Sequence, residues 1–241
     1  MTKGNQKGSA FERDMCRAFS LWYTSNQVDD LFWRTSGSGS RATNRAAAGN
    51  DLTKYQHGDM TFIRPEGQAL LDYFSFEFKS YSGIDFHGIF HTISPDKSLL
   101  SFWAKGVRDA EVSGRVPILV TKVVRGKPVI WFPSAMLSVF TSAGYGVIAD
   151  RGFQFWVPIS QVVTKRTYPR RKKGAKKAKK GKGKPKIETY DLPEPQHVVG
   201  ISLESFFSCL QDPQRLMLGL QVVGLERMPV PRRKDPAHEA A

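Results

Sequence analysis

Cysteine is scarce in this chain of 241 residues, with Cys16 and Cys209 as its two examples. Two cysteines exclude a disulfide framework and a cysteine-based zinc site. No apolar run approaches the roughly 18 residues that a membrane helix needs, and the opening Met1–Lys7 lacks the apolar region of a signal peptide. We therefore expect a cytoplasmic protein (in the host cytoplasm if its source is viral), with neither a membrane partner nor a nucleotide cofactor.

Acidic residues are also few, because 22 Asp and Glu stand against 36 Lys and Arg, which gives a formal net charge of +14. A chain this basic favours a polyanionic partner, and nucleic acid before a membrane. The segment Lys165–Lys186 alone holds 13 Lys and Arg residues and no acid. Such blocks lack regular structure when free and bind nucleic acid, or simply keep a chain soluble. We expect DNA contacts from this segment, including Lys172, Lys173, Lys176 and Lys177.

Two alternating runs hold the candidate chemistry. Asp59–Ile63 is the first run and Tyr73–Lys79 the second, with a turn-like Arg64–Gly67 between them. Successive side chains of a strand point to opposite faces, so the phenylalanines of the second run share one face and Glu77 and Lys79 share the other. If the two runs pair as a hairpin, Asp59 approaches Glu77. Two such carboxylates suit Mg²⁺, which keeps several waters and binds substrate phosphate.

Helical and alternating patterns elsewhere predict the remaining elements. Ser9–Glu12 has the spacing of a capping box, and Ser94-Pro95 and Gly114 have the composition of a helix start and stop. Lys105 and Arg108 lie on this second helix, where they could face the substrate, although we expect them to face solvent. We predict helices at 9–25, 94–114, 136–140, 204–210 and 213–228, and strands at 31–34, 116–124, 128–132, 153–157 and 197–203.

Gly58-Asp59 followed by Glu77-Phe78-Lys79 resembles the signature of the PD-(D/E)XK nuclease superfamily. The resemblance covers about residues 7–133 and implies an α/β fold of the restriction-endonuclease type. Its αβββαβ core has a mixed central sheet flanked by helices, with the Asp on the second strand and E-x-K on the third; here a C-terminal extension follows. It implies catalytic roles for Asp59, Glu77 and Lys79, and metal ligation by Asp59, Glu77 and the Phe78 carbonyl. The cofactor would be Mg²⁺, with Mn²⁺ as a substitute.

The opening Lys7–Arg13 is similar to that of Holliday junction resolvases of the archaeal type and of phages. This likeness implies that Glu12 reaches the metal site; the alternative is that Glu12 only caps its helix. It also implies that Arg34 and a serine of the following loop, Ser36 or Ser38, contact DNA, with Ser38 as a catalytic candidate. The loop 35–57 adds Arg41 and Arg45, and its glycine and serine content also fits a plain linker.

We predict a Holliday junction resolvase, a metal-dependent endonuclease that hydrolyses phosphodiester bonds in four-way DNA junctions as a homodimer, and a phage source would suit it. The alternatives are a nuclease of the same fold acting on duplex, flap or site-specific DNA, a non-enzymatic basic DNA-binding protein, and an RNA-binding protein. His87 and His91 could hold zinc or face DNA from a loop. We expect a nuclease core with an N-terminal arm at 1–163, an irregular and disordered basic loop at 164–187, a return segment that packs on the core at 188–228 and a flexible tail at 229–241.

Overall fold

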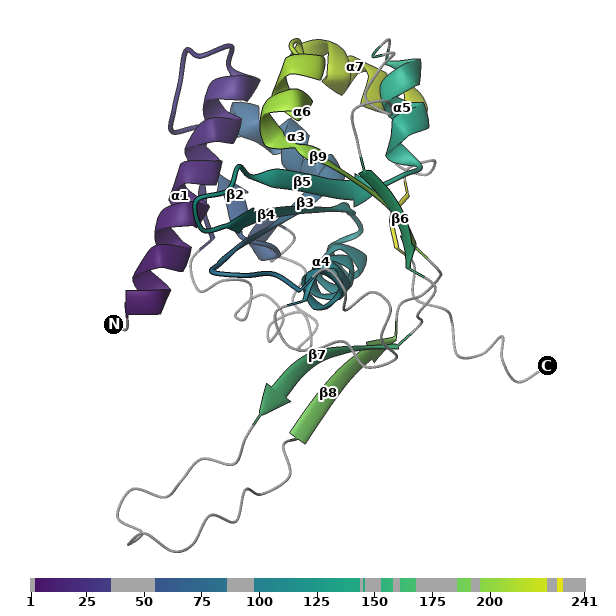
Figure 1. Ribbon diagram of the computed structural model, residues 1–241. Helices are drawn as coiled ribbons and strands as arrows, with labels where there is room; N and C mark the ends of the chain where they lie inside the picture. Colours follow the sequence, from purple (N-terminus) through teal and green to yellow (C-terminus); the bar gives the residue numbers. More distant parts are fainter. Residues whose placement is uncertain are drawn as a thin grey trace, which may run out of the picture.

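The computed structural model describes residues 3–35, 55–85, 98–143, 145, 153–157, 161–167, 186–191, 196–224 and 229–231. Its centre is a five-stranded mixed sheet with the strand order β3-β4-β5-β9-β6 (Figure 1). Strands β3 (Phe74–Tyr81) and β4 (Val116–Val123) run parallel, and β5 (Val129–Pro133), β9 (Gln196–Ser202) and β6 (Phe153–Val157) continue the sheet by antiparallel pairing. The α/β fold expected from the sequence is confirmed.

The sheet is the middle of three layers. Helix α4 (Leu99–Ser113) covers one face and connects the parallel strands β3 and β4 (Figure 1). The other face packs against α1 (Lys3–Tyr23), α3 (Gln68–Tyr73), α5 (Met136–Ser142), α6 (Leu203–Cys209) and α7 (Pro213–Val223). Successive side chains of a strand point to opposite faces of the sheet and so pack in different cores. In β4, Ile118 and Val120 belong to the larger core, while Leu119 belongs to the core beneath α4.

Local sequence explains where several helices begin and end. Ser98 caps α4 by accepting a hydrogen bond from the Ser101 amide at 3.1 Å, and Gly114 ends the helix in the left-handed region at φ 64°. The predicted start at Ser94-Pro95 is therefore wrong, while the predicted stop at Gly114 is confirmed. Helix α1 already begins at Lys3, so Ser9 lies within it and the predicted capping box is wrong.

The hairpin expected between the two alternating runs does not form. Strand β2 (Met60–Phe62) pairs with β1 (Phe32–Arg34) in a separate two-stranded sheet. The short helix α3, which follows a 3₁₀ turn η2 (Pro65–Gly67), lies between β2 and β3 in the chain. Six residues span less than two helical turns, so periodicity could not separate this helix from the start of a strand.

The far end of the chain is part of the central sheet. Strand β9 lies between β5 and β6, so residues 196–202 complete the fold rather than pack on its outside. Before it, β7 (Gln161–Thr167) and β8 (Lys186–Asp191) form an antiparallel ribbon that projects past α4 (Figure 1). The prediction that all of 164–187 is irregular is wrong at its two ends, because these belong to paired strands; 168–185 lie outside the described residues.

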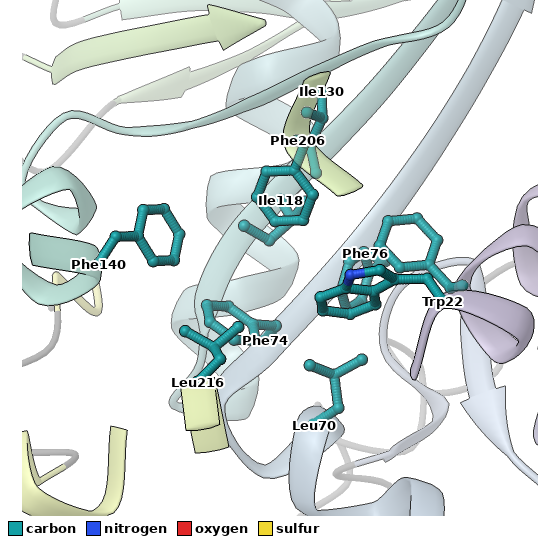
Figure 2. Close-up of a pocket in the computed structure, with 10 residues that line it drawn as sticks. Trp22, Leu70, Phe74, Phe76, Ile118, Ile130, Phe140, Phe206 and Leu216 are labelled. Atoms are coloured by element: carbon teal, nitrogen blue, oxygen red, sulfur yellow. The ribbon is translucent and has the colours of Figure 1, made fainter. Parts of the chain in front are cut away.

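A small cavity in the larger core is lined by apolar and aromatic side chains, including Trp22, Phe76 and Phe206 (Figure 2). It lies on the sheet face opposite α4 and offers a ligand no anchoring charge, so the candidate chemistry must be sought elsewhere. None of the described helices combines the length and the apolar character that crossing a membrane requires.

Candidate active site

The polar face of β3 lies beneath α4, and Asp59 reaches it from the chain just before β2. The Asp59 amide donates to the Phe76 carbonyl at 2.6 Å, and the Phe78 amide donates to Asp59 Oδ2 at 2.8 Å. These two bonds fasten residue 59 alongside β3 without a paired hairpin. The expected meeting of Asp59 and Glu77 therefore occurs by a different route, with both carboxylates buried at 2% and 1% exposure.

Lys79 lies where the oxygens of this site converge. Its ammonium donates to Asp59 Oδ2 at 3.1 Å and to the Phe78 carbonyl at 3.0 Å, and it forms an ion pair with Glu77 Oε1. Three oxygens from two side chains and one backbone group thus surround a single cationic nitrogen. The structure brings together four of the residues predicted from the sequence: Asp59, Glu77, Phe78 and Lys79.

A second ammonium enters the site from α4. Lys105 donates to the same Glu77 Oε1 and lies 3.7 Å from Asp109 Oδ2, one helical turn further on. The sequence interpretation of Lys105 as solvent-facing is therefore wrong. Asp109 is itself buried, and its other oxygen lies 3.9 Å from Arg108 Nε. The residues around Glu77 thus form a chain of alternating charge from β3 onto the helix.

These neighbours shift the pKa values of the buried groups in opposite directions. Burial and the nearby Glu77 carboxylate raise the pKa of Asp59 to about 6. Burial alone would raise the pKa of Glu77 too, but the ammonium groups of Lys105 and Lys79 outweigh it and lower that pKa to about 2. Burial opposes the charge of Lys79, yet the two carboxylates raise the pKa of its ammonium above the ordinary value. Lys79 is accordingly protonated in this state.

The donor set fits a divalent cation. Asp59, Glu77 and the Phe78 carbonyl offer hard oxygens, which Mg²⁺ and Mn²⁺ prefer. Glu77 Oε2 is buried and has no hydrogen-bond partner among the described residues, so one ligand-type oxygen is left unsatisfied. The described residues contain no group of three or more His, Cys, Asp and Glu side chains able to hold a metal, so water and backbone oxygens would have to complete the coordination.

A buried arginine fixes the chain just before Asp59. Arg115 Nη2 donates to the His57 carbonyl at 2.9 Å, and Nη1 donates to the Phe74 carbonyl at 3.2 Å. Gly58, between His57 and Asp59, has φ 85°, and a Cβ there would lie 2.5 Å from the Phe76 carbonyl oxygen. Glycine at 58 therefore permits both the turn and the close approach to β3.

Glu12 is paired with Arg34 rather than with the lysines. Arg34 Nε and Nη2 donate to Glu12 Oε2 at 2.9 and 2.8 Å, and the Glu12 side chain is 16% exposed. This contact ties α1 to β1 and accounts for both residues structurally. Among the described residues Glu12 belongs to no metal-ligating cluster with Asp59 and Glu77, so its predicted metal role finds no contact in the structure.

Several predicted residues fall outside the described part of the chain: Ser36, Ser38, Arg41, Arg45, His87, His91, Lys172, Lys173, Lys176 and Lys177. Their predicted roles remain predictions. Sequence reasoning missed the parts that Lys105, Asp109 and Arg115 play. One available signal was the Lys105–Asp109 spacing of four, which places both on one helix face. Nothing local indicates that this face lies over Glu77.

Residues 3–150 match a protein family described as "phage putative PDDEXK endonuclease". The match covers more than half of the chain and includes all of the residues gathered around Glu77. No curated protein and no solved structure gave a match.

Proposed function

The chain belongs to this family of phage PD-(D/E)XK endonucleases, and from that premise we propose that it is a metal-dependent DNA endonuclease that hydrolyses phosphodiester bonds. One observation carries the proposal: oxygens of Asp59, Glu77 and Phe78 converge on the single cation Lys79 Nζ. Two buried carboxylates and a carbonyl around one point form a cation site, and this one occupies the family's motif positions.

Asp59, Glu77 and the Phe78 carbonyl would hold Mg²⁺, with Mn²⁺ as a substitute. When bound, the ion lowers the pKa of a coordinated water and offsets negative charge on the scissile phosphate. The burial of both carboxylates keeps competing waters away from the ligand oxygens. The unpartnered Glu77 Oε2 faces no protein donor in the described part of the chain and is available as a ligand.

Lys79 contributes a positioned positive charge. Its ammonium is protonated while the two carboxylates face it, so it acts first as a hydrogen-bond donor to the attacking water or to a phosphate oxygen. Serving as a proton acceptor would require its contacts with Asp59 and Glu77 to be lost. The contacts of the metal-free protein therefore support an orienting and charge-neutralising role for Lys79.

For the substrate we propose a four-way DNA junction cut by a homodimer. The support is the likeness of the opening Lys7–Arg13 to that of the resolvases. A two-fold dimer is the commonest oligomer and matches the symmetry of a junction. Recognition of phosphate positions rather than bases agrees with the basic composition.

The decisive experiment compares cleavage of a mobile four-way junction, a flap and a linear duplex of equal length in Mg²⁺. We expect cutting by the wild type, loss in Glu77→Gln and no change in Glu204→Gln. Glu204 is the matched control because it pairs with Lys127 at 2.7 Å on the exposed surface. Activity that survives in Glu77→Gln would refute the nuclease site. Equal cutting of all three substrates would remove junction specificity and keep the nuclease.

Glu77→Gln also separates catalysis from binding. The isosteric amide keeps the shape of the site, so the variant should still bind DNA while it no longer cuts. A non-enzymatic DNA-binding protein would instead show no cleavage with the wild type and unchanged binding in the variant. Thermal denaturation of both proteins is needed beside these assays, because two lysines lose their shared carboxylate.

A further inference from the structure

Lys105 is the most unusual member of the site, because it comes from α4 and lies outside the motif that defines the family. Its ammonium and that of Lys79 bind the same oxygen, Glu77 Oε1. One carboxylate oxygen thus faces two cations, while Glu77 Oε2 has no hydrogen-bond partner among the described residues. Pairing for stability alone would spread the two ammonium groups over both oxygens.

Lys105 also has a second carboxylate within reach. Asp109 Oδ2 lies 3.7 Å from Lys105 Nζ, which is an ion-pair distance but too long for a hydrogen bond. The two residues are one turn apart on α4, so a small rotation of the lysine side chain brings its ammonium to Asp109. The Lys105 side chain is 32% exposed and has room to move, whereas those of Glu77 and Asp109 are 2% and 6% exposed.

Helix α4 passes close to β3 at this point. A Cβ placed on Gly106 would lie 3.8 Å from Glu77 Cβ, so the helix backbone beside Lys105 lies almost against the strand. This proximity holds Lys105 at Glu77, and no loop motion is needed to bring it there. The Lys105 ammonium can therefore pair with Glu77 or with Asp109 by rotation of its side chain alone, while the α4 backbone stays in place.

We propose that Lys105 is an internal counter-ion that occupies Glu77 in the metal-free protein and moves to Asp109 when a divalent cation binds. Lys105 would then be a positioning residue that sets metal affinity through Glu77, and Asp109 would be the residue that receives it. This inference rests on the proposed function, because it presupposes that Glu77 is a metal ligand.

The charges support an exchange of this kind. Asp59 and Glu77 together supply two negative charges, and Lys79 and Lys105 balance them. A divalent cation added to this balanced set would leave two excess positive charges beside it. Movement of Lys105 onto Asp109 removes one of these from the ligand oxygens and gives the buried Asp109 a direct partner.

The test is the affinity of the free protein for Mn²⁺, measured by isothermal titration and by loss of the free ion's paramagnetic resonance signal. Lys105→Met should bind Mn²⁺ about tenfold more tightly or better, because the like charge paired with Glu77 is gone. Lys105→Arg keeps the charge and should bind like the wild type. Lys127→Met removes a charge of the same sign from the exposed surface and should also leave the affinity unchanged.

A double-mutant cycle tests the receiving role of Asp109. Asp109→Asn should weaken Mn²⁺ binding in the wild-type background, because Lys105 then has no alternative partner and stays on Glu77. The same change in the Lys105→Met background should have a clearly smaller effect. Equal effects in both backgrounds would refute the movement onto Asp109. Misfolding cannot imitate the expected gain in affinity of Lys105→Met, since damage to the site would weaken binding.

The outcomes also separate this inference from the proposed function. If wild type binds Mn²⁺, Asp59→Asn abolishes that binding and Lys105→Met leaves the affinity unchanged, the counter-ion role is refuted and the metal site stands. If wild type does not bind Mn²⁺, or Asp59→Asn binds as well as wild type, the proposed metal site itself fails.

Discussion

Replacement of Arg115 by methionine tests how the protein holds its first carboxylate. The guanidinium is fully buried and donates to the carbonyls of His57, Phe74 and Leu71, at 2.9, 3.2 and 3.3 Å, and to the Ser113 hydroxyl at 2.9 Å. It ties the chain before Asp59 to the start of β3. Methionine fills much of the same volume without any donor, so the substitution removes the hydrogen bonds and leaves the packing largely intact.

Two opposing contributions set the change in the free energy of unfolding that we expect for Arg115→Met. Three buried carbonyls lose a charged donor, and at about 2 kcal/mol each this destabilises the fold by roughly 6 kcal/mol. Against it, burial lowers the pKa of Arg115 well below its ordinary value, to about 10, and relief of that unfavourable burial offsets roughly 3 kcal/mol. We expect Arg115→Met to lower the free energy of unfolding by about 3 kcal/mol.

The assay is urea denaturation of Arg115→Met beside Arg17→Met. Arg17 pairs with Asp29 at 2.9 Å, but both side chains are at least half exposed, so its loss should change stability by less than about 1 kcal/mol. Mn²⁺ affinity should also fall in Arg115→Met, because no guanidinium then holds the His57 carbonyl and the segment before Asp59. Equal stability of the two variants would show that the hydrogen bonds to the carbonyls only offset the cost of the buried charge. It would refute the expectation that Arg115 stabilises the fold.

Further predictions concern other parts of the chain. Gly58→Ala should lower the melting temperature and Mn²⁺ affinity together, because its Cβ would lie 2.5 Å from the Phe76 oxygen at a φ of 85°; an unchanged melting temperature would contradict this. Burial raises the pKa of Cys16 to about 12, so the thiol ionises at lower pH in the unfolded chain than in the folded protein, and the free energy of unfolding should fall as pH rises from 9 towards 12. Cys16→Ala should make this fall with pH less steep. In the native protein a thiol reagent should modify the less buried Cys209 before Cys16. Deletion of 168–185 should weaken DNA binding and flatten its salt dependence with Mn²⁺ affinity unchanged, and an identical salt slope would argue against phosphate contacts there.

Alternation along single strands made much of the fold predictable from the sequence. The side-chain period of two depends on the backbone of one strand alone, so Phe74, Phe76 and Phe78 could be assigned to the core face and Glu77 to the other. All three phenylalanines are buried in the larger core. The strongly β-branched run at 116–124 was predictable for the same reason, and it forms β4.

Partners across the sheet were not predictable in the same way. The nearness of Asp59 and Glu77 was inferred from a hairpin, yet the two meet through the Asp59–Phe76 backbone bond and the contact of Asp59 with the Phe78 amide. Strand β9 enters the sheet from more than sixty residues beyond β5. Such pairings depend on the three-dimensional path of the chain, which local pattern does not encode.

The failure at Lys105 shows where sequence reasoning breaks down at this site. A lysine near the middle of an amphipathic helix is by default solvated, and α4 has a well-defined apolar face elsewhere, with Trp103 and Val107 buried. Lys105 faces Glu77 because parallel pairing of β3 and β4 lays the connecting helix over the polar face of β3, where the helix backbone at Gly106 lies close to Glu77. The Lys105 ammonium therefore reaches Glu77 because α4 is the crossover connection between β3 and β4. A search for such residues in related chains should examine this connecting helix rather than the motif.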